Sequence, residues 1–200
     1  MKYKAEMQKI KRYSHMLRIV TNVFYWAAIA AAAGSLLALI IIRLLPDTHF
    51  ELSAGSIGHS GFSLNSIIKY DVNDVSLQGV SMKNVYLTIM LMSAVIFGLM
   101  IPALKQLVLI LKTVEEDKPF TVENAKRISS LGGILVICSF LIPAIEVLVA
   151  NAIIDTLKIQ DISTNYSMNV LLLLAGLMLF ILGGIFKYGS YLQYEYDETV

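Results

Sequence analysis

Residues 19–42 read IVTNVFYWAAIAAAAGSLLALIII, an uncharged run of 24 residues between Arg18 and Arg43. The hydrocarbon core of a bilayer is about 30 Å thick, so a spanning helix needs about 20 apolar residues. Three further runs are long enough: residues 84–104 and 162–186 are uncharged, and residues 128–154 contain Glu146 as their only charged residue. The chain is therefore predicted to be an integral membrane protein with four spans.

We predict an all-α, four-transmembrane-helix bundle that forms a single membrane domain over residues 1–200. The composition agrees, since 56% of the residues are hydrophobic and 16% are charged, and the mean hydropathy is +0.68. We expect a retained first anchor rather than a signal peptide cleaved near residues 30–35, because the apolar run continues through Leu45. The expected spans are 19–45, 84–111, 128–152 and 163–187, with an outer loop at 46–83 and an inner loop at 112–127.

The distribution of Lys and Arg predicts the orientation of the spans, because these residues are enriched in cytoplasmic segments. The N-terminal tail, the segment between spans two and three, and Lys187 together carry twelve of the sixteen basic residues. The opposite side carries the other four, Arg43, Lys69, Lys83 and Lys158. Both termini are therefore expected in the cytoplasm of a multi-pass cell (plasma) membrane protein.

The N-terminal tail has a pattern of its own. Met7, Ile10 and Leu17 recur at helical spacing, which predicts a short helix on the inner membrane surface. Complementary charge also suggests that this basic tail meets the acidic C-terminal end.

The outer loop is the long extracytoplasmic segment. The runs 62–70 and 72–80 alternate partly between apolar and polar residues, which is compatible with a small β-hairpin. A sensing or binding role for this loop and a solvated cap over the bundle are both open. His49, His59, Asp47 and Glu51 could in principle bind a metal, but their spacing matches no strong metal-binding pattern, so no metal site is predicted.

The inner segment is the most patterned part of the chain. An acidic cluster at 115–117 precedes Pro119, which ends the helix, and Thr121 can cap the next helix. Asn124 and Arg127 lie three residues apart on one helical face, where they could bind the acidic tail or a cytosolic partner, or form an intramolecular clasp. The candidate inner-face motif is Pro119, Phe120, Thr121, Asn124 and Arg127.

Glu146 is the outstanding residue inside the spans, because an ionisable group in a bilayer is costly to bury. The predicted orientation brings polar residues of the other spans to its depth, and Pro143, one turn earlier, can kink the helix. The group could serve as a ligand, ion or proton site, or a Glu146–Arg43 pair could fix helix register. The predicted intramembrane polar cluster is Glu146, Arg43, Tyr86, Thr88 and Asn169.

The search for catalytic motifs finds no HExxH, GxSxG or phosphate-binding loop. We therefore predict no catalytic residues, no cofactor and no enzymatic activity. Direct nucleic-acid binding is not expected either, because the basic residues are distributed as membrane topology requires.

Two strings resemble a known family: DKPFTVENAKRI at 117–128, followed by Gly132, and IFKYG at 185–189 with the acidic end beyond it. They are similar to the bacterial membrane proteins grouped as domain of unknown function 2975. The resemblance implies a four-span membrane domain covering essentially the whole chain. Members are often encoded beside a small helix-turn-helix regulator, which implies the membrane component of a regulatory pair. The long outer loop is not part of this resemblance.

We therefore expect a non-enzymatic membrane protein of regulatory, signalling or immunity type that acts through protein contacts. The expected partners are the lipid bilayer, a membrane or cytosolic regulatory protein, and further copies of the same chain in a homo-oligomer. The alternative is a small oligomeric transporter or channel subunit that uses the Glu146 region.

Overall fold

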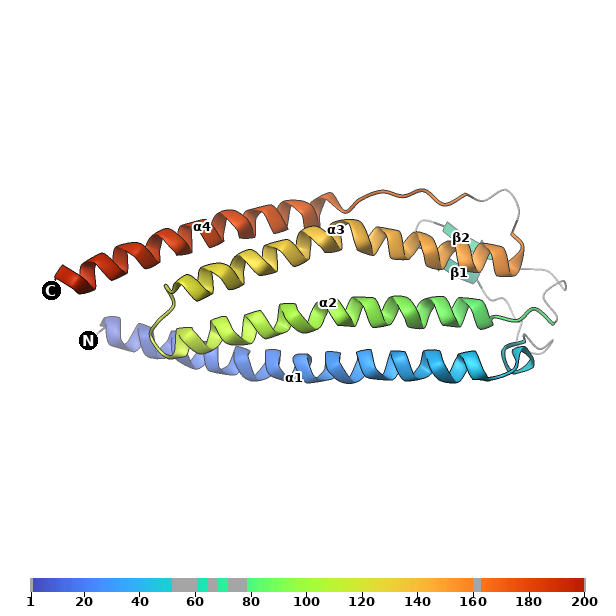
Figure 1. The fold of residues 1–200 in the computed structure, drawn as a ribbon, viewed down its shortest axis with the longest axis horizontal. Coiled ribbons are helices and arrows are strands. Elements are labelled where there is room, and N and C mark those ends of the chain that lie inside the picture. Colours follow the sequence, from blue (N-terminus) through green and yellow to red (C-terminus); the bar gives the residue numbers. More distant parts are fainter. Residues whose placement is uncertain (1, 52–60, 65–67, 72–78, 160–162, 200) are drawn as a thin grey trace. The chain divides into compact units, whose positions relative to one another are not determined.

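The computed structural model describes residues 2–51, 61–64, 68–71, 79–159 and 163–199. Its main elements are four helices, each long and apolar enough to cross a membrane. The prediction of a multi-pass helical membrane protein is confirmed by the number, length and hydropathy of these helices (Figure 1). The helices are α1 (Lys2–Leu44), α2 (Lys83–Glu115), α3 (Val122–Leu157) and α4 (Val170–Thr199).

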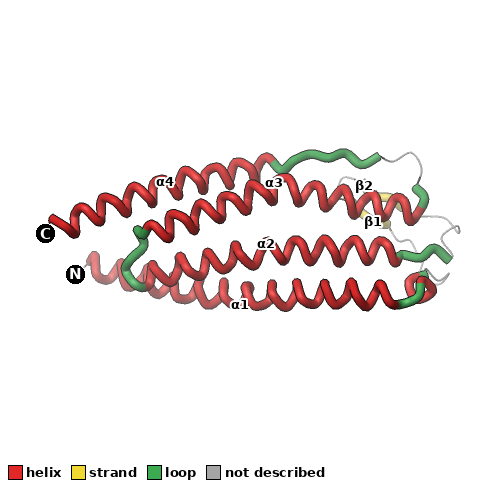
Figure 2. The backbone as a smooth tube through the Cα atoms, viewed as in Figure 1, coloured by secondary structure: helices red, strands yellow, loops and turns green. Residues whose placement is uncertain are grey.

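Three short elements lie between α1 and α2 (Figure 2). A 3-10 helix, η1 (Asp47–Phe50), follows α1, and strands β1 (Gly61–Leu64) and β2 (Ile68–Asp71) pair antiparallel. Gly61 lies opposite Asp71, and Leu64 lies opposite Ile68. Both strands come from the first alternating run, and most of the second, residues 72–78, lies outside the described residues together with His59.

Helix α1 differs from the expected short surface helix followed by a span. It runs without interruption from Lys2 to Leu44. Nothing in the sequence of this segment breaks a helix, since residues 2–44 contain no proline and a single glycine, Gly34. The basic tail is therefore the first part of the membrane helix itself.

Helix α2 ends in a tight turn that needs no glycine. Lys118 N–H donates to Thr113 O at 2.9 Å and Asp117 N–H donates to Val114 O at 3.3 Å, the pattern of a Schellman motif. Asp117 takes the left-handed conformation at φ 60°, which aspartate adopts more readily than most residues. Pro119 then prevents the helix from continuing.

Helix α4 begins at Val170, seven residues after the expected start of the fourth span. Asn169 sets this start, because its Oδ1 accepts the Leu172 N–H at 3.1 Å as an N-cap. The Asn169 N–H also donates to Ser139 O of α3 at 2.9 Å. The polar stretch 163–169 is therefore not helical.

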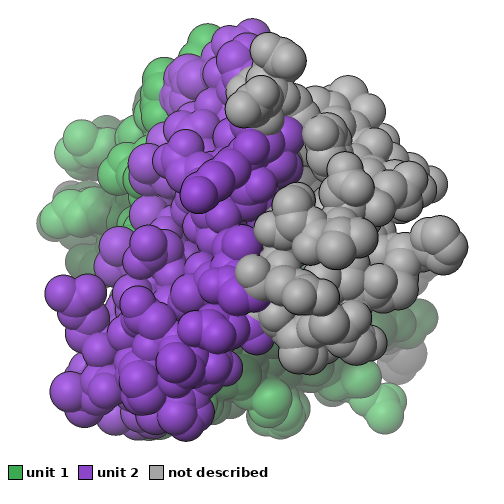
Figure 3. Space-filling model, turned by 90° about the vertical axis from the view of Figure 1, so that its right-hand side faces the viewer, with its two compact units in different colours: residues 1–32, 95–142, 168–200 green, residues 33–94, 143–167 purple. Residues whose placement is uncertain are grey.

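The chain divides into two compact units (Figure 3). The first contains residues 1–32, 95–142 and 168–200, and the second contains residues 33–94 and 143–167. The first unit holds both termini and the α2–α3 turn, which lie at the same end of the unit (Figure 1).

Small residues allow α3 and α4 to approach closely in the first unit. A Cβ atom built on Gly132 would lie 2.8 Å from Gly176 O, and one built on Gly176 would lie 2.8 Å from Gly132 O. Farther along, Gly183 lies against Ser129 and Ala125 O. The two helix backbones are thus in direct contact at glycine positions.

In the second unit a polar cap joins the end of α1 to the start of α2. Lys83 Nζ donates to Leu45 O at 2.7 Å and lies 2.9 Å from the carboxylate of Asp47. Phe50 O accepts the Met82 N–H at 2.9 Å. The Lys83 side chain is 16% exposed, and its ammonium group satisfies the backbone carbonyl of Leu45 directly after α1.

Candidate functional site

The α2–α3 turn, residues 116–121, is the point where side chains of all four helices of the first unit meet. We call the residues that hold it the turn cluster. They come from α1, α2, the turn itself, α3 and α4, in that order: Lys11, Arg18, Thr113, Glu115, Asp117, Pro119, Phe120, Asn124, Arg127 and Phe186.

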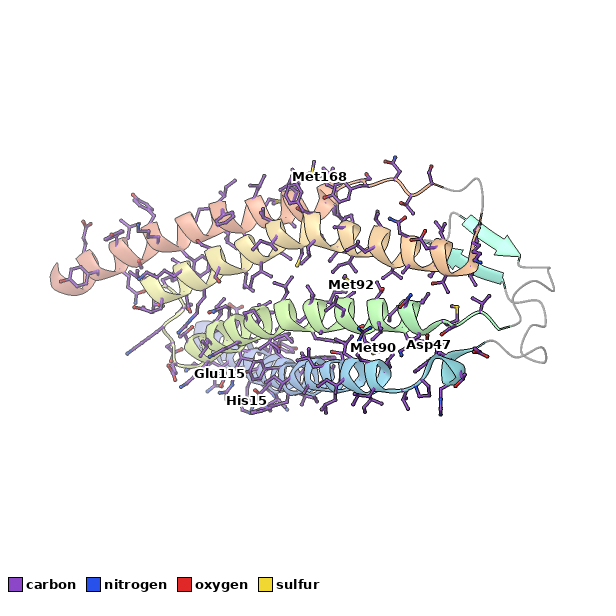
Figure 4. The ribbon with its side chains drawn as sticks, turned by 45° about the vertical axis from the view of Figure 1, so that its right-hand side comes forward. His15, Asp47, Met90, Met92, Glu115 and Met168 are labelled. Atoms are coloured by element: carbon purple, nitrogen blue, oxygen red, sulfur yellow. The ribbon has the colours of Figure 1, made fainter. Side chains whose placement is uncertain are left out.

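Ion pairs attach α1 to the end of α2. Arg18 Nε lies 2.9 Å from Glu115 Oε1, and both atoms are shielded from solvent. His15 Nδ1 lies 3.4 Å from Glu115 Oε2, and Lys11 pairs with Asp117. Figure 4 shows His15 and Glu115 next to each other where α1 meets α2. The acidic cluster that ends α2 therefore binds the basic residues of α1.

Asn124 is the buried centre of the turn cluster, with no exposed surface. Its Nδ2 donates to Thr113 Oγ1 at 2.6 Å and to Pro119 O at 2.9 Å. Its Oδ1 accepts Nη1 of Arg127 at 2.8 Å. Thr121 caps α3 by accepting the Asn124 N–H at 3.1 Å, as predicted. Asn124 thus ties α2, the turn and α3 together through satisfied hydrogen bonds.

Phe120 attaches the turn to α4. Its ring packs against Phe186 with the centroids 5.1 Å apart and an interplanar angle of 36°. A Cβ atom on Gly189 would lie 3.2 Å from Phe120 Cδ1, so the absent side chain at this position gives the ring its space. Phe120 is nevertheless 47% exposed.

Of the five residues of the predicted inner-face motif, Pro119, Phe120 and Thr121 lie in the turn, and Asn124 and Arg127 lie in the first two turns of α3. Of the alternatives for Asn124 and Arg127, the observed contacts are those of an intramolecular clasp. Arg127 Nη1 contacts Leu109 O at 3.4 Å as well as Asn124. A contact of the buried Asn124 amide with the acidic tail is not observed among the described residues.

Four residues of the predicted intramembrane cluster lie in α1, α2 and α3, and Asn169 directly precedes α4. Glu146 is an exposed residue of α3, and Arg43 is an exposed residue near the end of α1. Among the described residues no ion pair joins them. Tyr86 packs its ring 5.9 Å from that of Phe50.

The side chains of the two remaining members form local hydrogen bonds with backbone groups. Thr88 Oγ1 donates to Asn84 O at 2.9 Å, one turn earlier in α2. Asn169 is the N-cap of α4 and belongs to the first compact unit, whereas Glu146 belongs to the second. The grouping of these residues around Glu146 stays a prediction.

Three contacts of the turn cluster are not predicted by the sequence analysis: Arg18 with Glu115, Lys11 with Asp117, and Asn124 with Thr113. The opposite charges of the first two pairs are visible in the sequence. They do not identify the partners, because the acidic C-terminal end carries the same charge as residues 115–117. A polar residue near an N-cap is normally expected at the surface. Asn124 differs because Thr113, which accepts a hydrogen bond from its amide, becomes its neighbour only when α2 and α3 fold back on each other.

The chemistry of the turn cluster is that of cation–carboxylate pairs, amide hydrogen bonds and aromatic packing. Among the described residues, no group of three His, Cys, Asp or Glu side chains could hold a metal ion. The geometry holds four helices in register at one end and exposes part of an aromatic side chain there.

The fold and the turn cluster define a multi-pass helical membrane protein held together at one end by a polar and aromatic clasp. A family model described as a protein of unknown function (DUF2975) matches residues 64–200. This match covers more than half of the chain, which therefore belongs to that family. The matched residues include α2, α3, α4 and the whole α2–α3 turn. Neither a curated protein nor a solved structure matches the chain.

Proposed function

We propose that the protein is a non-enzymatic regulatory or signalling membrane protein that acts through protein contacts at the end formed by the turn cluster. The observation that carries this proposal is an exposed aromatic surface on α4 beside the turn. Its described members, each between 49% and 67% exposed, are Tyr188, Tyr191, Leu192 and Tyr194.

The length of α4 supports a role for this surface outside the membrane. Helix α4 continues for twelve residues after Lys187, and at about 1.5 Å per residue this adds roughly 18 Å. Tyr188 lies at the level of an interfacial aromatic anchor, whereas Tyr191 and Tyr194 lie one and two turns farther along. Tyrosine is enriched at the centres of protein interfaces, where it supplies large apolar area and a polar end.

The proposed membrane topology places this surface in the cytosol. Both termini and the α2–α3 turn lie at one end of the first unit. Twelve of the sixteen basic residues lie in residues 2–18, in residues 105–127 and at Lys187. Such a charge bias favours a cytoplasmic location for that end in a plasma membrane. The partner is then a cytosolic or membrane regulatory protein, and the turn cluster fixes the position of α4 relative to α1, α2 and α3.

A pull-down from native membranes in mild detergent, with mass spectrometry of the recovered proteins, tests this function. Wild-type protein is expected to recover a specific regulatory protein. Replacing Tyr188 and Tyr191 together by serine should reduce its recovery about tenfold or more, because exposed tyrosines at interfaces act as hot spots. Tyr13→Ser is the matched control, since Tyr13 is 70% exposed on α1.

The recovered species decide between the hypotheses. Equal losses for Tyr13→Ser and the double variant would contradict a specific surface on α4. Recovery of the chain only as a partner-free homo-oligomer would contradict the regulatory proposal and would favour the transporter alternative.

A further inference from the structure

An open pocket with a volume of about 300 Å³ lies between α1 and α2 in the first unit. Its lining combines two polar and two apolar side chains: Arg18, Ile19, Asn22 and Val108. Arg18 and Asn22 are four residues apart, so they lie one above the other on the same face of α1. The pocket therefore presents a cation and an amide one turn apart, with aliphatic walls.

The position of the pocket along α1 is that of a membrane–water boundary. Arg18 is the last charged residue before the uncharged run 19–42. Arginine at such a place extends its guanidinium towards the headgroups while its aliphatic stem stays in the apolar layer. The pocket thus opens at the depth where phospholipid headgroups join their acyl chains.

Asn22 lies below this boundary and has an unused amide. It is an exposed residue of α1, and its side chain has no hydrogen-bond partner among the described residues. An amide without a partner is costly in an apolar environment. Thr21, the neighbouring polar residue, instead donates its hydroxyl to Leu17 O at 2.8 Å. The Asn22 amide is therefore available to an external acceptor or donor.

Arg18 also has donors left for a ligand. Its guanidinium carries five N–H groups in a planar fork. The contact with Glu115 uses Nε, and the 3.5 Å contact with His15 uses Nη2. The side chain is 31% exposed, so the remaining donors can reach a phosphate oxygen.

We propose that this pocket binds the phosphate group of a phospholipid headgroup, with Arg18 and Asn22 donating to its oxygens and Ile19 and Val108 contacting the glycerol region. This inference does not depend on the proposed regulatory function. Because Arg18 also pairs with Glu115, lipid binding and the attachment of α1 to α2 share one guanidinium.

The test uses delipidated full-length protein titrated with phosphatidylglycerol and, separately, with diacylglycerol of the same acyl chains, followed by native mass spectrometry. Phosphatidylglycerol is expected to remain bound and diacylglycerol is not. Asn22→Leu should weaken phosphatidylglycerol binding about fivefold through one lost hydrogen bond, and Arg18→Gln about tenfold or more through a lost charged one. Arg12→Gln removes an exposed charge outside the pocket and should change phosphatidylglycerol binding less than about twofold.

Three results would overturn the proposal. Equal binding of diacylglycerol would show that the phosphate is not recognised. An equal loss for Arg12→Gln would show general charge attraction rather than a site. Displacement of the lipid by inorganic phosphate would assign the pocket to soluble phosphate compounds. Asn22→Leu leaves the Arg18–Glu115 pair intact, so its result stands even where Arg18→Gln unfolds the protein.

Discussion

Asn124→Leu is expected to lower the free energy of unfolding by about 3 kcal/mol, because each buried group that loses its hydrogen-bond partner costs about 1–3 kcal/mol. Leucine is similar in size but offers nothing to Thr113, Pro119 O or Arg127, the three groups that Asn124 now satisfies. An SDS titration of the protein in mixed micelles, followed by circular dichroism, measures this free energy.

The matched control is Asn84→Leu, the same substitution at an exposed residue near the start of α2. Its expected effect lies within about 0.5 kcal/mol of zero. Combining Asn124→Leu with Thr113→Val should cost less than the sum of the single changes, because the two side chains share one hydrogen bond. Equal effects at Asn124 and Asn84, or strict additivity, would contradict the role assigned to the buried amide.

Gly176→Val is expected to separate α3 from α4 and to cost about 2–3 kcal/mol through overpacking. A Cβ atom at Gly176 would lie 2.8 Å from Gly132 O and 3.0 Å from Val136 N, and these backbone atoms cannot move without moving α3. The same SDS titration detects the loss of stability.

Gly184→Val provides the control on the same helix, since a Cβ atom at Gly184 meets nothing within 4 Å among the described residues. We expect its free energy of unfolding to stay within about 0.5 kcal/mol of the wild type. If both valine variants are equally stable, the close approach of α3 and α4 at Gly176 is wrong.

The four membrane helices could be predicted because a bilayer-length apolar run is a local property of the sequence. The Thr121 cap could be predicted for the same reason, since it involves residues three apart. The tight α3–α4 contact has a signal that is easily overlooked: Asn169, Gly176, Gly183 and Ser190 recur every seven residues along one face of α4.

The contacts between helices could not be predicted to the same degree. Glu115 could equally have paired with a residue other than Arg18, because many basic residues lie within reach of an acidic cluster at a helix end. Asn124 is buried only because Thr113 folds back over it, a contact that requires the turn geometry at Asp117. The expected start of the fourth span, residue 163, is too early because a hydropathy pattern does not detect the helix cap at Asn169.

The proposed regulatory contacts and the cytosolic partner both require the α2–α3 turn to face the cytosol. Labelling of single cysteines with a membrane-impermeant maleimide tests this directly, in a Cys138→Ser background. The two reporters are Glu116→Cys in the turn and Thr48→Cys in η1, both at exposed positions. Thr48→Cys is predicted to react in intact cells, and Glu116→Cys only after the membrane is permeabilised. Labelling of Glu116→Cys in intact cells would contradict the proposed function.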